Sequence, residues 1–342
     1  MGKLVSFDIF SDFGFFKKPD INDFGLTYNL PPKSVILGII GSILGLTGLG
    51  KQYDEIFQLK EILDIGHALT EVHNKTKHLI KKVDFDAVQN GLESLKFKKQ
   101  EKLLEMLKLL GKTKEKEPVE IYDELKEIIT ELEIELQYPE YYRQLKHLNI
   151  GIKPPSEGFP FNKIMNKYNT RNSYFGGAKY DNNIISEQLL IRPKYRIYVY
   201  DDTEKILNEL VVRIKNKNPI FMPYLGKNEF IANFDNLEII TDIKPIKNRP
   251  KTHISSVFLR STKIENNESD NEDEYHLRGA TMVTGLPQGF KFLEYYPVGY
   301  LNKGMQYEFQ VAEFTAQSVE MSKIDLDKGK LFEINEEIIY LS

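Results

Sequence analysis

Residues 151–200 contain the clearest chemistry in the chain, because basic and aromatic side chains are interleaved there. The segment has eight Lys and Arg against three Asp and Glu. Cations neutralise phosphates and flat rings stack on unpaired bases, which is the combination that single-stranded RNA binding needs. The candidate ligands are Lys163, Lys167, Arg171, Tyr174, Lys179, Arg192 and Lys194. A solvated surface loop whose tyrosines pack on the domain would have the same composition, so that interpretation stays open.

A second candidate site lies at the start of an apolar, glycine-rich segment at residues 35–50. Backbone N–H groups at a helix N-terminus, beside Lys33 and Ser34, form an anion site. Lys17 and Lys18 belong to an earlier loop, which we expect to lie outside any core, and they could reach the same phosphates. Ordinary helix capping beside exposed lysines is the alternative.

The other polar motifs predict neither catalysis nor a metal. Three histidines follow one another at spacings of six and five, whereas a metal pair on one helix face needs three or four: His67, His73 and His78. His147 and His253 are isolated in the sequence. Gly226 and Lys227 lack the flanking residues of a P-loop. We therefore predict no catalytic residue, no metal and no cofactor.

The elements that would position these residues follow from the hydrophobic pattern. Residues 4–10 predict a strand, and residues 35–50 predict a helix that is buried on most sides because it has no charge. Gly38, Gly41 and Gly45 fall on one face of that helix and predict close packing. The run is too short for a membrane span.

Residues 51–148 differ from their surroundings, because leucine and isoleucine recur there at helical spacing among many charges. We interpret this segment as a helical insertion. After it, strands are predicted at residues 148–152, 189–200, 219–225 and 230–243, with a helix at 203–215 and a long loop at 156–187. Without the insertion, the order is that of a ferredoxin-like or RRM-like domain.

The remaining residues and the composition set the wider limits. From residue 251 the pattern is mainly β, with strands expected at 253–260, 290–296, 306–314 and 331–341, and an acidic loop at 265–274. The chain has no cysteine and a net charge of −4, so a reducing compartment is compatible and no global sign of nucleic-acid binding exists. We expect no secretory leader.

Several motifs resemble the CRISPR-associated Cas family five, and most closely its subtype I-B branch. The opening is the most specific part: a strand, then FKKP at residues 16–19, LTYNLPPKSVILG at 26–38 and GSILGL at 41–46. The stretches LNIGI at 148–152 and PYLGKNEF at 223–230 are similar too. The resemblance covers residues 1–50 and 140–245 well, and the C-terminal part only loosely.

The resemblance implies an α+β fold with an RRM-like or ferredoxin-like RAMP domain. That domain would be split between residues 1–50 and 149–246, with a β-hairpin thumb at about 153–196, the helical insertion at 51–148 and a mainly β domain at 247–342. The implied role is a non-catalytic, cytoplasmic subunit of a type I-B Cascade complex in antiviral defence. Such a subunit caps the 5′ handle of the CRISPR RNA, contacts the backbone and large subunits, meets target DNA only indirectly and binds no membrane.

The RNA-binding residues that we predict on both grounds are Lys17, Lys18, Lys33, Ser34, Lys163, Lys167, Arg171, Tyr174, Lys179, Arg192, Lys194 and Lys227. One branch of the family instead cleaves the CRISPR RNA precursor without metal, using Tyr, Lys and His. Residues 151–200 contain no histidine, which favours a non-catalytic subunit. A protein-interaction subunit without RNA contact is a third possibility. The insertion departs from the family pattern, and we expect it to dock a neighbouring subunit or target DNA.

Overall fold

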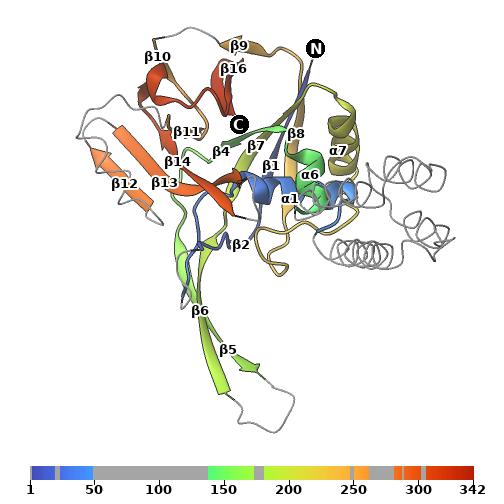
Figure 1. The fold of residues 1–342 in the computed structure, drawn as a ribbon, viewed down its shortest axis with the longest axis vertical. Coiled ribbons are helices and arrows are strands. Elements are labelled where there is room, and N and C mark those ends of the chain that lie inside the picture. Colours follow the sequence, from blue (N-terminus) through green and yellow to red (C-terminus); the bar gives the residue numbers. More distant parts are fainter. Residues whose placement is uncertain are drawn as a thin grey trace, which may run out of the picture. The chain divides into compact units, whose positions relative to one another are not determined.

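A computed structural model describes residues 2–19, 24–48, 138–172, 181–246, 250–261, 281–286, 289–301 and 306–342. The chain divides into two compact units. The larger consists of Met1–Leu46, Gln144–Leu301 and Gln306–Ser342, and the smaller of Thr47–Arg143 and Asn302–Met305. Helices and strands are both present, as predicted, and most of the described elements are strands in several sheets (Figure 1).

A four-stranded antiparallel sheet lies at the centre of the larger unit. Its strands stand in the order β4-β7-β1-β8, and their bounds are Lys3–Phe10 for β1, Asn149–Lys153 for β4, Lys194–Asp201 for β7 and Asn233–Ile240 for β8. Helix α1 (Lys33–Leu44) follows β1, and helix α7 (Lys205–Lys215) connects β7 to β8. Along the chain, these four strands and two helices follow the order β1-α1-β4-β7-α7-β8.

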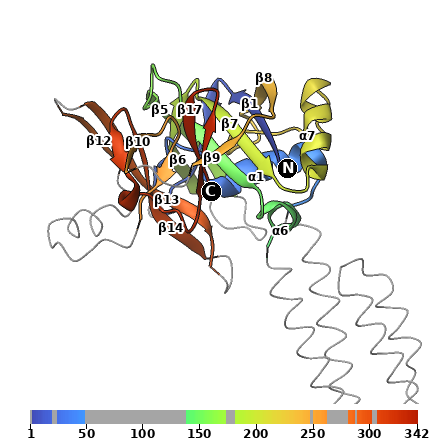
Figure 2. The ribbon, with the colours of Figure 1, turned by 90° about the horizontal axis from the view of Figure 1, so that it is seen from above.

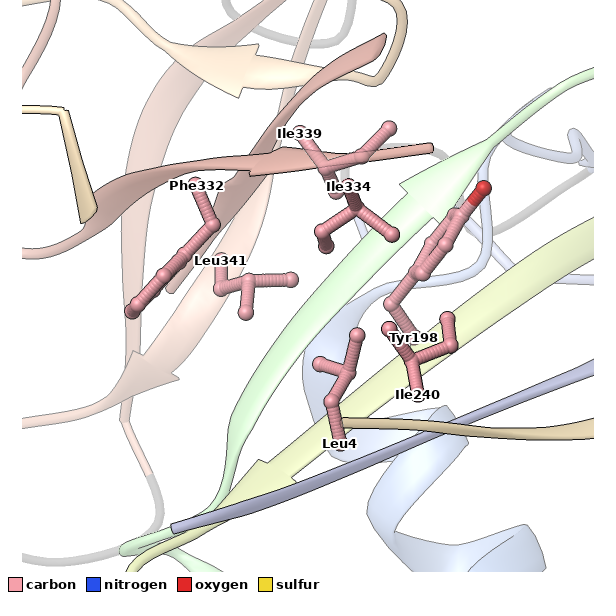
Figure 3. Packing of buried hydrophobic residues seen from close by; sticks show 7 residues of the cluster. All are labelled: Leu4, Tyr198, Ile240, Phe332, Ile334, Ile339 and Leu341. Atoms are coloured by element: carbon pink, nitrogen blue, oxygen red, sulfur yellow. The ribbon is translucent and has the colours of Figure 1, made fainter. Parts of the chain in front are cut away.

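The two faces of this sheet are buried in different ways. Leu4, Tyr198 and Ile240 point to one face, where side chains of β16 (Lys330–Ile334) and β17 (Glu337–Leu341) cover them (Figure 3). Side chains of a strand alternate between faces, so Val5, Phe7 and Ile9 point the other way and are also buried. On that side α7 packs against β1, β7 and β8 and lies beside α1 (Figure 2).

Helix α1 is buried along most of its length, as the uncharged sequence predicts, and it packs against α7 and β13 (Gly289–Tyr300). No helix in the described part of the chain is long and apolar enough to span a bilayer. Close packing at Gly45 is confirmed, because a Cβ there would lie 2.6 Å from Ile220 Cδ1. Gly45 also has a second role that the spacing does not predict. Gly45 has φ +81° and ends the helix, because its N–H reaches Ser42 O and the next N–H reaches Gly41 O.

A long β-hairpin connects β4 to β7 and replaces the loop predicted at residues 156–187. Strand β5 (Lys163–Asn172) pairs along its whole length with β6 (Asp181–Ile191), and Figure 1 shows the hairpin extending away from the central sheet. Two short strands flank β6, namely β2 (Phe13–Gly14) and β3 (Phe24–Gly25).

The single strand predicted at residues 189–200 is two strands with a turn between them. Arg192 adopts φ +48°, and its N–H donates to Asp12 O while Pro193 O accepts from Ser11 N. The alternation of apolar residues continues through Arg192 and Pro193, which is why the sequence pattern conceals the turn. The strand predicted at 219–225 is also wrong, because only an isolated bridge between Tyr224 and Ile231 forms there.

The described C-terminal residues are mainly β, as predicted. One sheet has the order β11-β14-β13-β12, a pair joins β10 to β15, and β9 lies beside β16. The bounds are Lys244–Ile246 for β9, Lys251–His253 for β10, Phe258–Leu259 for β11, Thr281–Leu286 for β12, Tyr307–Thr315 for β14 and Ser318–Glu320 for β15, with a 3-10 turn at Met321–Lys323. The acidic loop predicted at 265–274 lies outside the described residues.

In the smaller unit the structure describes residues 47–48 and 138–143. Helix α6 (Glu140–Leu145) begins here, and the amide and hydroxyl of Thr47 donate to the Glu140 carboxylate at 2.9 and 2.5 Å. Most of the helical insertion predicted at 51–148 lies outside the described residues.

Candidate nucleic-acid interface

Three of the predicted RNA-binding cations are exposed on the sheet built around β6 or on segments bonded to it. Lys167 lies in β5, Arg192 lies in the turn after β6, and Lys17 forms an isolated bridge with Thr27. Each is exposed, and no ion pair joins any of them to another described residue. Their charges are therefore available to phosphates.

Lys163 occupies the same strand as Lys167 but is partly buried. Its Nζ donates to Thr27 O at 3.3 Å. Burial lowers the pKa of Lys163, and the neighbouring Glu294 raises it in part. Arg171 also lies in β5, but its side chain, Tyr174 and Lys179 are outside what the structure describes.

Lys18 does not have the exposed position that we expected for it. Its side chain is 6% exposed, its Nζ lies 3.6 Å from Glu294 Oε1, and the Tyr28 ring centroid is 5.1 Å away. The prediction that this loop lies outside any core is wrong at Lys18, because a buried carboxylate compensates the ammonium charge. A phosphate would have to displace that partner.

Glu294 is the residue that sequence reasoning missed. It is fully buried in β13, and its carboxylate accepts from Asn29 N at 3.0 Å and from Leu30 N at 3.1 Å. Asn29 O in turn accepts from the buried Tyr195 hydroxyl at 2.5 Å. The TYNLPP motif thus has a structural purpose, which is to hold this carboxylate ahead of α1. Glu294 lies 265 residues from Asn29 in the chain, and no local sequence pattern indicates so distant a partner.

The start of α1 is less open to anions than predicted. Pro32 occupies the N-cap without a side-chain hydrogen bond, and Ser34 is buried. Burial lowers the pKa of Lys33 to about 8, so this lysine is a weaker cation than one in water. Lys33 contributes to a small pocket with Ile152, Phe258 and Tyr296.

Lys227 is already held by neighbouring side chains. Its Nζ donates to Glu187 Oε2 at 2.7 Å and lies 5.3 Å from the Tyr168 ring centroid. Burial lowers the pKa of Lys227, but the hydrogen bond and charge of Glu187 outweigh it, so the net pKa is raised. Lys227 therefore ties the loop after α7 to the hairpin.

A cleft of about 890 Å³ lies between the central sheet and the C-terminal strands, and Lys194 lines it. Its polar floor carries balanced charge. Lys194 lies 3.0 Å from Asp8 Oδ2, and Arg196 lies 3.2 Å from Asp8 Oδ1 and 2.7 Å from Glu238 Oε2. Lys153 pairs with Glu337 at 2.5 Å.

Asp8 is at the centre of this network. Burial raises the pKa of Asp8, but hydrogen bonds from Asn236, Lys194 and Arg196 outweigh it, so its pKa is lowered. The carboxylate therefore stays ionised at neutral pH. A volume in this range is typical of a ligand site.

The cleft also contains a residue that looked isolated in the sequence. His253 lines it together with Lys153, Lys194 and Tyr198. Burial and Glu337 raise the pKa of Tyr198 to about 12, so this phenol keeps its proton at neutral pH. Among the described residues no group of three His, Cys, Asp or Glu could hold a metal ion, and His67, His73 and His78 lie outside them.

Comparisons with known proteins find similar solved structures only. No family model matches the chain, and no curated protein matches it. A chain of a CRISPR RNA-guided surveillance complex is similar at a TM-score of 0.38 and 10% identity, covering 94% of this chain and 92% of that one. A chain of the type III-B Cmr-beta complex bound to cognate target RNA and AMPPnP is similar at a TM-score of 0.30 and 14% identity, covering 93% and 86%. Since both TM-scores lie below 0.5, neither likeness identifies the function of this chain.

Proposed function

We propose that the chain is a non-catalytic CRISPR RNA-binding subunit of a surveillance complex, of the Cas family five type and most similar to subtype I-B. It caps the 5′ handle of the RNA and links the backbone subunits to the large subunit. The sequence motifs at residues 16–46 support this proposal, together with a β1-α1-β4-β7-α7-β8 order that we interpret as a ferredoxin-like RAMP domain.

The observation that carries the proposal is the hairpin between β4 and β7. In chain order it lies between β4 and β7, the second and third strands of the central sheet, as a thumb would. It presents the exposed Lys167. Arg192, in the turn after β6, and Lys17, on the segment that bridges to Thr27, are two further exposed cations near the base of the hairpin. Exposed cations along an extended hairpin suit a phosphate backbone, because phosphate contacts dominate affinity.

The test is a charge-removal variant with a matched control. The interface variant combines Lys17→Ala, Lys167→Ala and Arg192→Asn, since asparagine tolerates the positive φ of Arg192. The control variant combines Lys205→Ala, Lys215→Ala and Lys217→Asn, which removes equal charge from exposed positions around α7, one of them also at positive φ. We expect the slope of log affinity against log salt for single-stranded RNA to fall by roughly 2 in the interface variant. The control should keep the wild-type slope.

Equal slopes in all three proteins would contradict this surface. If the purified chain and its complex contain no RNA while protein partners are retained, the protein-interaction alternative is favoured instead. The slopes are measured by fluorescence anisotropy with a labelled RNA that carries the repeat-derived 5′ end. Co-purified RNA and retained partners are measured by gel electrophoresis of the purified complex.

One observation favours the endoribonuclease alternative, namely that His253 shares a cleft with Lys153 and Tyr198. Histidine is the side chain most often used to move a proton to or from a reacting hydroxyl. Against it, Lys153 is ion-paired and Tyr198 keeps its proton, so neither is placed to act as a base at neutral pH. Incubating the isolated chain with repeat RNA and a chelator distinguishes the non-catalytic subunit from the endoribonuclease. Cleavage that disappears in His253→Ala would establish the alternative.

A further inference from the structure

We propose that the cleft between the central sheet and the C-terminal strands binds one unstacked nucleobase of the RNA. This inference rests on the proposed RNA-binding function and adds a base-binding site to it. All the residues that line the cleft belong to the larger unit.

One side of the cleft is aromatic. Phe159, Phe290 and Phe314 line it, and all three are half-buried. The Phe159 ring centroid lies 6.4 Å from that of Phe290 and 5.7 Å from that of Phe314, at interplanar angles of 77° and 84°. In an edge-to-face pair the edge of one ring covers a face of the other. All three rings nevertheless line the cleft and are only half-buried, so part of each stays open to a further flat ring.

The opposite side is polar but carries no excess charge. Three cations are each compensated by carboxylates: Lys153 by Glu337, Lys194 by Asp8, and Arg196 by Asp8 and Glu238. A phosphate would meet as much negative as positive charge, so it gains little here. A base has a neutral ring edge with both donors and acceptors, which matches guanidinium, carboxylate and hydroxyl groups side by side.

The cleft also lies close in the chain to an exposed cation. Arg192, an exposed candidate phosphate ligand, precedes the cleft residue Lys194 by two positions in the chain. An RNA strand whose phosphate backbone passes Arg192 can therefore turn a neighbouring base toward the phenylalanines. Splaying single bases into side-chain pockets is the usual way that proteins read single-stranded RNA.

The test compares a single-stranded RNA of about eight nucleotides with the same ribose-phosphate chain lacking its bases. In the wild-type protein we expect the base-bearing RNA to bind more tightly than the abasic chain. In Phe314→Leu, which keeps an apolar side chain but removes the ring, this preference should fall roughly 5- to 150-fold, as expected for loss of one stacked base. Affinity for the abasic chain should not change.

A second variant guards against an effect of Phe314→Leu on folding. Ala316 is exposed at the rim of the cleft, so Ala316→Trp narrows the cleft without altering the phenylalanines. Ser318→Trp, at an exposed position two residues further on that does not line the cleft, is the matched control. We expect Ala316→Trp to lose the base preference and Ser318→Trp to retain it.

Each outcome decides between the proposals. If no form of RNA binds, the proposed function fails and the base site fails with it. If RNA binds and the base preference is unchanged in Phe314→Leu and Ala316→Trp, only the base site is overturned. Loss of a partner protein in Ala316→Trp, with the base preference intact, would assign the cleft to that protein and also overturn the base site.

Discussion

At the scale of single residues, the partner of a cation decides what the cation can do. Lys18 and Lys17 are neighbours in a motif that looks uniformly basic, yet Lys18 is buried against Glu294 and Lys17 is exposed. Composition shows where Lys and Arg are frequent in the sequence. It could not show which lysines are neutralised, because Glu294 and Glu187 reach Lys18 and Lys227 from distant parts of the chain.

A double-mutant cycle tests the structural role of the Lys18–Glu294 pair. Breaking one partner of a buried pair leaves an uncompensated charge, so Lys18→Met and Glu294→Gln should each destabilise the protein by about 3–5 kcal/mol. The double variant should lose less than their sum, by about 1–3 kcal/mol. The measurement is the free energy of unfolding in urea.

The pair between Lys328 and Glu308 is the control for that cycle. Its atoms are closer, at 2.7 Å, but its side chains are 35% and 39% exposed. Solvent screening should therefore limit its coupling to less than about 1 kcal/mol. Equal coupling in the two pairs would show that burial does not strengthen Lys18–Glu294.

Lys33 gives a prediction about pH. Its pKa of about 8 in the folded protein is below the ordinary lysine value, so between pH 8 and about 10.4 the unfolded chain binds a proton that the folded chain does not. The contribution of Lys33 to the free energy of unfolding therefore rises with pH in that window. At pH 7, Lys33→Met should be more stable than wild type by about 1–3 kcal/mol, and the difference should shrink toward pH 10.

The control for Lys33 is Lys205→Met at an exposed position of α7. Its stability difference from wild type should not depend on pH between 7 and 10. A constant difference for Lys33→Met as well would contradict the buried environment of Lys33. Weaker RNA binding by Lys33→Met would support its predicted phosphate contact.

At the scale of elements, turns were harder to predict than strands. The strands β1, β4 and β8 follow their apolar residues, and the helix at 203–215 lies close to α7. The turn at Arg192 was concealed because a non-glycine residue adopts positive φ there, held by backbone bonds to residues 11 and 12. The hairpin was not recognised from the pattern, since β5 and the first part of β6 are mostly polar, and only the family resemblance pointed to it.

Gly226 shows what a glycine in the PYLGKNEF motif does. It has φ +88°, and a Cβ there would lie 1.7 Å from Phe15 O, beside the bond that Phe15 N donates to Leu225 O. Gly226→Ala should therefore cost about 2–5 kcal/mol through backbone strain and a forced shift of residue 15. Thermal unfolding measures the loss.

A substitution at Gly158 separates the backbone strain from the close contact. It has φ +76°, but a Cβ there would meet nothing within 4 Å. Gly158→Ala should cost only the backbone strain, about 1–2 kcal/mol. If both alanine variants lost the same stability, the close contact of Gly226 with residue 15 would be refuted.

At the scale of the whole molecule, the central sheet carries stability and the distal hairpin carries little. Many buried core residues lie on β1, on β7 and on the elements that pack against these strands. In the hairpin, by contrast, Ile184 is 69% exposed and Lys167 is exposed. A long element with few buried side chains is expensive to keep ordered unless another molecule covers it. Among the described elements, the hairpin is therefore the one that we expect to bind another molecule.

Shortening the hairpin tests this division. Replacing residues 169–184 with Asn-Gly joins Tyr168 to Ile185, which are paired in the antiparallel register, through a two-residue turn that suits a β-hairpin. The variant keeps the Lys227–Glu187 ion pair at the hairpin base. We expect its midpoint of thermal unfolding to stay within a few degrees of wild type, because the removed segment contributes no buried side chain among those described. In co-expression with the other subunits and the CRISPR RNA, the variant should be lost from the assembled complex, because the proposed thumb holds the RNA and the backbone subunits. A variant that assembles normally would remove the hairpin from the interface and leave the exposed cations at its base, Lys17 and Arg192, as the remaining RNA contacts to test.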